Sequence, residues 1–524
     1  MSPPEVQPTG SRRSAARATW VVMGGILASR VLGLVREQVV ALYFGRSGEL
    51  SAYWAAFKIP NLFRVLAGEG NLSASFIPVL SGQLARGETP ASRRTADVVL
   101  GFLLLGVGIF TVAGILLAPL LAVLAAPGFD EPLRELVTRL IRILFPVSAF
   151  LVLGAWCMGV LHAHGRFFWP NFAPVFLSLV SALSLVLLLG RWRRDPIELL
   201  AWGTVAGGLV QLLVQLPESR QVLEGLRPRL DLRDPGFRRV LVLFGPMLLG
   251  TGVAQINSLV ETQIASFLDP EAVSTLQYAV RLYTLPLSLF GTSVAMAALP
   301  ALSRESAGAS VGPLGEGVAD AWLRSLFFLI PSMVALAGFG RPLVTVIFER
   351  GAFTAEDSAA VTRVLAFYSL GLAAFATVRI LSQAFYALHD SRTPTRLSIL
   401  ALILNTALSA LLAWRVGTPG IALASTLAAF LSAGLLGWKL TRRIGPGWLR
   451  DSAPRVAALL CAGGMGAVAG LLARGRVEGA LPSGGGLASR LAALVTLYGA
   501  IGLAYLVAAR VAGFTLTGHD RRRG

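Results

Sequence analysis

The sequence predicts an all-α polytopic membrane protein, with about fourteen transmembrane helices in two parallel six-helix repeats followed by two C-terminal helices. Composition, recurring apolar stretches and an internal similarity together lead to this prediction. Of the 524 residues, 55% are apolar and only 14% are charged, whereas soluble globular proteins carry about 25% charged residues. The mean hydropathy is +0.68. Because such a chain cannot hide its apolar surface in water, a soluble enzyme, a disordered regulator and a disulfide scaffold are excluded.

Apolar stretches long enough to cross a bilayer recur along the whole chain, since a spanning helix needs about 20 residues. We expect the second stretch to bend or break at Pro60, and the ninth to end in a short separate helix after Pro342. The predicted spans are residues 18–43, 49–82, 94–125, 131–163, 169–190, 196–217, 237–268, 271–302, 315–348, 356–388, 394–415, 418–441, 453–474 and 488–512.

The net charge of +18 is interpreted as a topology signal and not as nucleic-acid binding. With the N-terminus in the cytoplasm, most arginines outside the spans fall in cytoplasmic segments, although the cluster Arg191–Arg194 opposes this bias. Both termini are therefore placed on the cytoplasmic side of the membrane. The two cysteines, Cys157 and Cys461, lie in apolar runs and indicate neither a disulfide framework nor a metal cluster.

The chain resembles itself at a spacing of about 223 residues, which predicts a duplication. Because six predicted spans separate the copies, the two halves have the same orientation. Five similarities occur in order, namely Glu37–Ala41 with Glu261–Ala265, Ile77–Ser81 with Leu299–Ser303, Pro119 with Pro342, Val137–Arg139 with Val361–Arg363, and His164 and Pro170 with His389 and Pro394.

The duplication defines the predicted domains, which are a tail (1–17), an N-lobe (18–217), a cytoplasmic linker (218–236), a C-lobe (237–441), two last helices (442–512) and a second tail (513–524). Two lobes around a central site are typical of alternating-access transporters. The alternative is a duplicated scaffold without a transport role.

Charged residues inside the predicted spans indicate the site. A charge at the bilayer centre costs at least about 2.5–3.5 kcal/mol, so it normally faces a cavity or a partner. Arg30 and Glu37 are seven residues apart and share one helix face. Five bases stand against two acids in the first, second and eighth spans, namely Arg30, Arg36, Lys58, Arg64 and Arg281 against Glu37 and Glu69.

A cavity lined by this set would trap an anion. The planar guanidinium of arginine suits phosphate oxygens, so the predicted ligand is a phosphate or diphosphate, such as a lipid head group. The alternatives are salt bridges between helices and arginines that extend to the membrane surface. We favour these structural roles for Arg139 and Arg142, which lie near a helix end.

The second copy keeps the acid of the first helix but not its bases, since Ala254 and Val260 replace Arg30 and Arg36 while Glu261 remains. Glu261 is therefore a candidate cation ligand. Asp390 and Thr406 would complete such a site if the tenth and eleventh spans come close. The alternative is that Glu261 is protonated or pairs with another base.

Four motifs resemble the MurJ (MviN) family, the proposed lipid II flippases of the multidrug/oligosaccharidyl-lipid/polysaccharide exporter superfamily. The resemblance covers the whole chain, with fourteen helices as in the family. The motifs are Ser29–Glu37 in the first helix, Ala56–Arg64 with Gly68–Gly70 and Phe76–Pro78 in the second, Tyr278–Pro286 in the eighth, and Phe385–Pro394 after the tenth.

The resemblance implies roles for individual positions. Arg30, Arg36, Arg64 and Arg281 match the cavity arginines taken to hold the diphosphate of lipid II, and Lys58 and Asn61 match polar residues of the same cavity. Glu261, Asp390 and Thr406 match a sodium site in the second lobe, and the last two helices would border a groove for the lipid tail. The chain departs from the family at three positions, since an acid is expected at Ser51, an acid or amide at Val280, and some members have Glu at Thr284.

These observations predict a monomeric flippase for lipid II that has no enzyme activity, no cofactor beyond a sodium ion for coupling, and no nucleic-acid partner. The alternatives are a flippase for another polyprenyl-diphosphate-linked glycan, a related exporter of the same superfamily, and a membrane enzyme or receptor acting on polyprenyl diphosphates. A drug–cation antiporter would need an acidic cavity, and an enzyme would need paired acids for a metal.

Overall fold

The computed structural model describes residues 9–68, 70–306, 312–478 and 487–514, and within these ranges the chain is helical and contains no strand. It divides into two compact units, Met1–Gln263 and Ile264–Gly524. The prediction of an all-α multi-pass membrane protein is thus confirmed. Glu69 of the predicted site lies outside the described residues.

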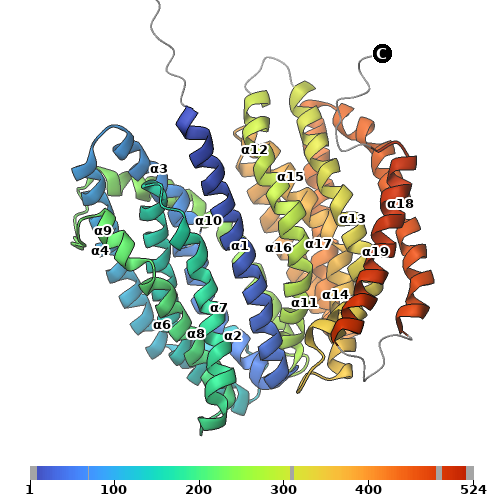
Figure 1. Cartoon of the computed structure of the whole chain (residues 1–524), viewed down its shortest axis with the longest axis horizontal. Coiled ribbons are helices and arrows are strands. Elements are labelled where there is room, and N and C mark those ends of the chain that lie inside the picture. Colours follow the sequence, from blue (N-terminus) through green and yellow to red (C-terminus); the bar gives the residue numbers. More distant parts are fainter. Residues whose placement is uncertain (1–8, 69, 307–311, 479–486, 515–524) are drawn as a thin grey trace, which may run out of the picture. The chain divides into compact units, whose positions relative to one another are not determined.

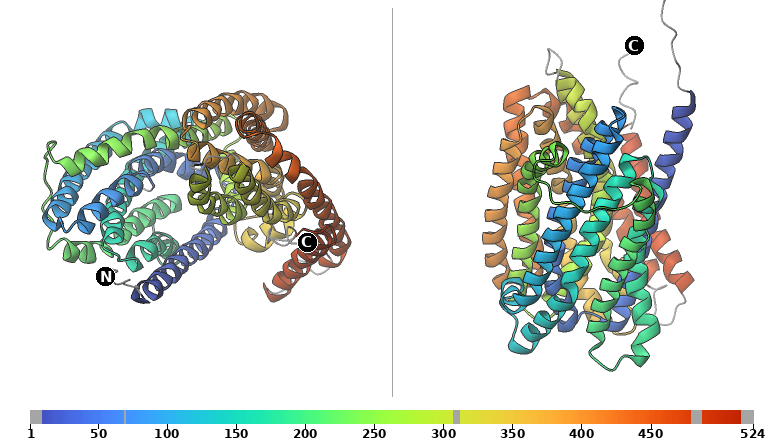
Figure 2. Two further views of the ribbon diagram at one scale, coloured as in Figure 1. Left: turned by 90° about the horizontal axis from the view of Figure 1, so that it is seen from above. Right: turned by 90° about the vertical axis from the view of Figure 1, so that its left-hand side faces the viewer.

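The first unit is built around α6, which contacts α2, α3, α4, α5 and α8, while α1 packs on α7 (Figures 1 and 2). Close approach explains the glycine at Gly25 in α1, because a side chain there would lie 2.7 Å from the carbonyl oxygen of Asn171 in α7. The helices of this unit are α1 (Thr9–Phe44), α2 (Gly48–Ala67), α3 (Asn71–Ala85), α4 (Thr89–Leu116), α5 (Ala118–Ala125), α6 (Glu131–Ala163), α7 (Phe168–Leu188), α8 (Pro196–Leu213), α9 (Leu216–Val222) and most of α10 (Pro235–Ser266).

The second unit surrounds α13, which packs against α12, α14, α15 and the C-terminal pair α18 and α19 (Figure 1). A π-helical turn, Leu287–Thr292, joins its first two helices. The helices are α11 (Ala272–Pro286), α12 (Ser293–Ser306), α13 (Gly312–Phe348), α14 (Ala355–Leu370), α15 (Leu372–Ala387), α16 (Arg392–Val416), α17 (Thr418–Ile444), α18 (Gly447–Glu478) and α19 (Leu487–Val511).

Most of the predicted spans coincide with helices. In the part of the chain that the structure describes, ten helices are long and apolar enough to cross a membrane, and α14 with α15, bent by 40°, make an eleventh. The three other predicted spans, 18–43, 49–82 and 237–268, fall in α1, in α2 with α3, and in α10. The total of fourteen therefore stays a prediction.

The expected break at Pro60 was wrong, because Pro60 lies inside the continuous helix α2. The break comes instead after Ala67, where the N–H of Gly68 bonds the carbonyl of Arg64 at 2.9 Å and Gly70 adopts a φ of +86°. Membrane helices tolerate proline when neighbours satisfy the freed carbonyl, whereas a positive φ ends a helix and favours glycine.

The ninth predicted span bends close to the predicted position. Phe339, three residues before Pro342, has non-helical backbone angles within α13. The hydroxyl of Tyr498 in α19 donates to the carbonyl of Phe339 at 2.8 Å. The C-terminal helix pair therefore satisfies a backbone group at this kink.

The turns after α6 and α15 have the same pair of backbone hydrogen bonds of a helix C-cap. His389 takes the place of Gly165 in this pattern, one residue from its predicted match with His164. The bonds are Gly165 N to His162 O (3.0 Å) and Arg166 N to Leu161 O (2.8 Å) after α6, and His389 N to Tyr386 O (3.0 Å) and Asp390 N to Phe385 O (2.9 Å) after α15.

An extended linker crosses α4 of the first unit. Arg94 of α4 forms an ion pair with Asp231 at 2.7 Å, and the Asp97 carboxylate accepts the N–H of Arg227 at 3.1 Å. The hydrogen bond from Arg94 holds the pKa of Asp231 below its ordinary value. A side chain at Gly101 would come within 2.1 Å of the Arg229 carbonyl oxygen, so the linker backbone lies directly on the helix.

Replacing His389 by glycine is expected to stabilise the protein. His389 has a φ of +58°, whereas the matching position in the first half is Gly165 at +74°. Because the His389 side chain is exposed, its loss removes little packing, and relief of the left-handed backbone should contribute about 0.5–1 kcal/mol. Thermal unfolding of His389→Gly in detergent should show a raised Tm, and Gly165→Ala a lowered one. A lower Tm for His389→Gly would contradict this interpretation.

Candidate functional site

The charged side chains of α1 include an ion pair of sequence neighbours. Arg36 Nη2 donates to Glu37 Oε1 at 2.6 Å, and the two side chains are 13% and 4% exposed. Arg30, one and a half turns earlier, is half-buried. One member of the predicted cationic set thus has a carboxylate partner within its own helix.

A second group of polar side chains follows one face of α2. Lys58, Asn61 and Arg64 are spaced by three residues, which places them on neighbouring turns of the helix. Asn61 Oδ1 accepts from both Nε and Nη2 of Arg64, at 3.0 and 2.8 Å. This fork-shaped contact orients the guanidinium through a neutral oxygen.

Lys58 reaches a different helix. Its Nζ donates to Oγ of Ser258 in α10 at 2.7 Å. Ser258 was not predicted as a site residue, and only the folded structure brings it to Lys58 across 200 positions of sequence. Like Asn61, Ser258 is a neutral acceptor.

The corner between α2 and α3 is held by Asn71. Its Nδ2 donates to the carbonyl of Leu66 at 3.0 Å and to Oγ1 of Thr251 in α10 at 2.8 Å. The first bond satisfies a carbonyl at the end of α2, where the helix has no further N–H to offer. Asn71 is a positioning residue that the sequence prediction missed, although an asparagine directly after a glycine-rich break in an apolar span was a usable signal.

Arg281 lies in the second unit, on α11, where its side chain is exposed. One turn further on, Thr284 donates its hydroxyl to the carbonyl of Val280 at 2.6 Å. Ser51, at another departure from the family pattern, is fully buried in α2. The three positions that depart from the family pattern, Ser51, Val280 and Thr284, all have neutral side chains.

The proposed pairing of Asp390 with Thr406 in a sodium site was wrong. Asp390 precedes α16 and is bound by Thr393 and by Arg443, whose Nη2 lies 2.8 Å from Asp390 Oδ2. Thr406 lies fourteen residues inside the same straight run of helix, about 21 Å further along at 1.5 Å per residue. The two side chains therefore cannot bind the same ion, because the oxygen ligands of a metal ion lie within about 2.6 Å of it.

Glu261 belongs to the first unit, where its Oε1 accepts from Nδ2 of Asn257 at 3.0 Å. Among the described residues, no group of three or more histidine, cysteine, aspartate or glutamate side chains has the arrangement of a metal site. The role of Glu261 as a cation ligand stays a prediction.

Arg139 has the structural role predicted for it. At the end of the first unit it forms ion pairs with Asp195 at 3.0 Å and with Glu198 at 3.4 Å. These two acids precede and begin α8. Arg139 therefore ties α6 to α8, away from the polar face of α2.

Apolar helices that carry cations, amides and hydroxyls at interior positions define a multi-pass membrane protein of the transporter type. The family model described as lipid II flippase MurJ matches residues 40–482. The chain therefore belongs to the lipid II flippase MurJ family.

Relatives of known name cover most of the chain. It is 35% identical over 460 residues to the lipid II flippase MurJ of Burkholderia cenocepacia, covering 86% of this chain and 89% of that protein. It is also 35% identical over 426 residues to the probable lipid II flippase MurJ of Vibrio cholerae, covering 79% and 81%.

Solved structures agree with the fold. The structure of the lipid II flippase MurJ in an inward closed conformation has a TM-score of 0.73 and 25% identity, with 94% of this chain and 98% of that chain covered. An inward-facing multidrug resistance transporter of the MATE family has a TM-score of 0.66 at 15% identity, covering 81% and 96%. The second likeness concerns the fold alone.

Removing Glu37 alone is expected to destabilise the protein strongly. Glu37→Leu leaves the Arg36 guanidinium without its carboxylate in a largely buried place, which costs about 3–5 kcal/mol. Thermal unfolding in detergent should show a large drop in Tm. The double variant Arg36→Leu/Glu37→Leu removes both charges and should recover most of the loss, because apolar replacement of a whole pair is often neutral. A double variant as unstable as Glu37→Leu would show that the pair is not the reason.

Proposed function

We propose that this protein is a lipid II flippase, which moves the undecaprenyl-diphosphate-linked peptidoglycan precursor from the inner to the outer leaflet of a bacterial inner membrane. The observation that carries the proposal is the polar face of α2 in a chain of this family. There, Lys58 donates a hydrogen bond to Ser258 of α10, and Arg64 donates to Asn61.

Cations on an apolar helix suit a diphosphate ligand. Lys58 and Arg64 bring positive charge to one face of α2. Charge-assisted bonds from arginine or lysine to phosphate oxygens are short and roughly twice as strong as neutral ones. Arg64 and Lys58, with Arg30, Arg36 and Arg281 from the other predicted helices, would bind the diphosphate and the sugar next to it.

Transport would proceed by alternating access. The head group enters from the cytoplasmic side while the polyprenyl chain stays in the bilayer, and the lobes then change orientation so that the head leaves on the outer side. Because cations line the proposed path, the membrane potential would act on the cycle, at about 2.3 kcal/mol per charge and 100 mV. No bond of the substrate is made or broken, so the protein would act as a transporter and not as an enzyme. It would work as a monomer with both termini in the cytoplasm, and would serve peptidoglycan synthesis and cell shape.

Loss of the cavity charge at Arg30 or Arg281 is expected to abolish flipping. In proteoliposomes containing fluorescent lipid II, Arg30→Ala and Arg281→Ala should lower the rate of head-group exposure at least tenfold, because each removes a charge-assisted bond worth about 1.5–3 kcal/mol. Arg324→Gln is the control, since Arg324 forms an exposed ion pair with Asp320 at 3.4 Å, and such pairs contribute little. Its rate should stay within twofold of the parent protein.

The same variants also test the role in cells. The parent gene and the Arg324→Gln gene should prevent lysis of a bacterium depleted of its own flippase, while Arg30→Ala should not, at equal amounts of membrane-inserted protein. Full activity of Arg30→Ala would contradict the proposed site. Release of labelled phosphate or undecaprenol from lipid II would contradict the proposed reaction class and favour an enzyme.

A further inference from the structure

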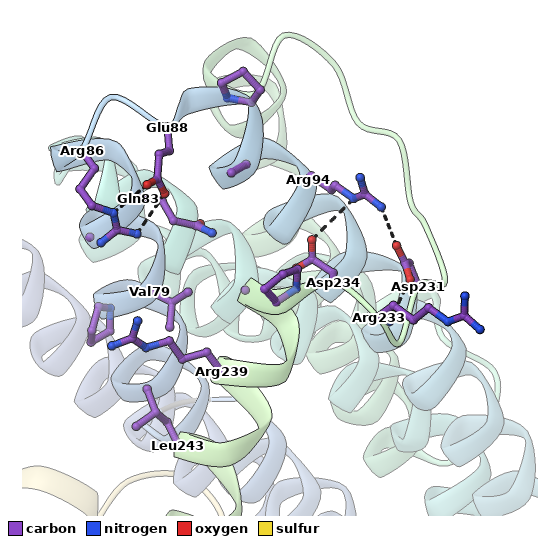
Figure 3. A pocket seen from close by; sticks show the side chains of 16 residues that line it. Val79, Gln83, Arg86, Glu88, Arg94, Asp231, Arg233, Asp234, Arg239 and Leu243 are labelled. Carbon is purple, nitrogen blue, oxygen red and sulfur yellow. Dashed lines mark hydrogen bonds and ion pairs between the residues drawn. The ribbon is translucent and has the colours of Figure 1, made fainter.

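A cavity of about 740 Å³ lies at one end of the first unit, where α3 ends and α4 and α10 begin (Figure 3). It is separate from the polar face of α2, since no residue of α2 lines it. Its walls come from α3, the N-terminal turns of α4 and α10, and the linker before α10. Nothing in the proposed transport site accounts for it.

Arginines dominate the charge of this cavity. Four line it, with three carboxylates. Two of the arginines have acidic partners, since Arg86 bonds Glu88 at 2.9 Å and Arg94 bonds Asp231 at 2.7 Å. Arg239 is different, because no hydrogen bond or ion pair of its side chain occurs within the described ranges. Figure 3 shows its guanidinium extending across the cavity toward the side of Val79. Arg239 therefore offers a charged donor to a ligand.

A buried acceptor without a partner lies in the same wall. Gln83 is 8% exposed, and its Nε2 donates to Oγ1 of Thr95 at 3.1 Å. Thr95 in turn donates its hydroxyl proton to Oδ1 of Asp234 at 3.3 Å. The Thr95 oxygen therefore accepts from the NH2 group of Gln83, and the amide oxygen Oε1 points elsewhere. Within the described residues, Gln83 Oε1 has no hydrogen-bond partner. A buried polar atom of this kind costs free energy unless a ligand or water donates to it.

The cavity also has an apolar side. Pro78 and Val79 of α3 and Leu243 of α10 line it, and Leu243 is 37% exposed. Leu243 lies one turn beyond Arg239 on the same helix, so the charged and apolar walls are adjacent. A ligand that fills the cavity therefore needs an anionic group, a hydrogen-bond donor and an apolar part.

We propose that this cavity binds the head group of an anionic phospholipid that carries hydroxyl groups, of the phosphatidylglycerol type. The phosphodiester accepts from Arg239, a glycerol hydroxyl donates to Gln83 Oε1, and the first part of the acyl chains lies against Val79 and Leu243. A lipid with an amine head group would place a second cation beside Arg239 and Arg233. Inorganic phosphate would leave the apolar wall uncovered. The inference does not depend on which lipid the protein transports.

Binding is measured on the full-length protein in detergent by native mass spectrometry. Palmitoyl-oleoyl phosphatidylglycerol should bind at least tenfold more tightly than the matching phosphatidylcholine, and Arg239→Gln should weaken that binding about tenfold, as expected for one charge-assisted bond. Arg450→Gln is the matched control, because Arg450 is exposed on α18 in the second unit and loses the same charge. Its affinity should remain within twofold of the parent.

A second comparison tests the hydroxyl contact. Phosphatidylmethanol has the same charge as phosphatidylglycerol but no hydroxyl, so the parent protein should prefer phosphatidylglycerol and Gln83→Met should lose that preference. Equal binding of phosphatidylglycerol and phosphatidylcholine would overturn the proposal, as would equal effects of Arg239→Gln and Arg450→Gln. Competition by sn-glycerol 3-phosphate as strong as that by the lipid would show a site for a soluble phosphate ester and would also overturn it.

Discussion

The structure of this protein depends on partners for the charged and backbone groups inside its apolar helices. Water is absent from the hydrocarbon region, so an unsatisfied polar group there costs several kcal/mol. Arg36 forms an ion pair with Glu37, and the carbonyl of Leu66 accepts a hydrogen bond from Asn71. The Asn71 bond joins the end of α2 to the start of α3 and so fixes the corner between them, whereas the Arg36–Glu37 pair neutralises charge within α1.

The requirement also explains which parts of the fold were predictable. Hydropathy and length identify apolar helices such as α6 and α17, because their formation depends on local composition. The breaks depend on backbone angles, so Gly70 with its positive φ mattered more than Pro60. Partners such as Ser258 lie 200 residues from the side chain they serve. Only the packing of the helices brings such partners together, and no periodicity in the sequence predicts the contact.

The failed pairing of Asp390 with Thr406 has the same origin. Both residues carry oxygen ligands, Asp390 between the tenth and eleventh predicted spans and Thr406 within the eleventh, and the family resemblance assigned both to one site. A straight helix separates them by about 21 Å along its axis. Asp390 serves the turn itself, where Thr393 and Arg443 hold it. Residue type suggests which side chains could bind a cation, but only geometry decides whether the ligands meet.

The linker and α10 show how polar contacts fix a boundary between units. The sequence places the start of the second lobe at residue 237, whereas the first unit extends to Gln263. Four hydrogen bonds hold α10 and the residue before it to the first unit. Asp234 accepts the N–H of Phe237 at 2.8 Å and the hydroxyl of Thr95 at 3.3 Å, Thr251 accepts from Asn71, and Ser258 accepts from Lys58. They lie along about 30 Å of α10. These contacts are at the start, in the middle and near the end of α10, so most of the helix belongs to the first unit. The polar face of α2 and the cavity beside Arg239 are separate sites that share one helix. α10 supplies Ser258 to the first and Arg239 to the second.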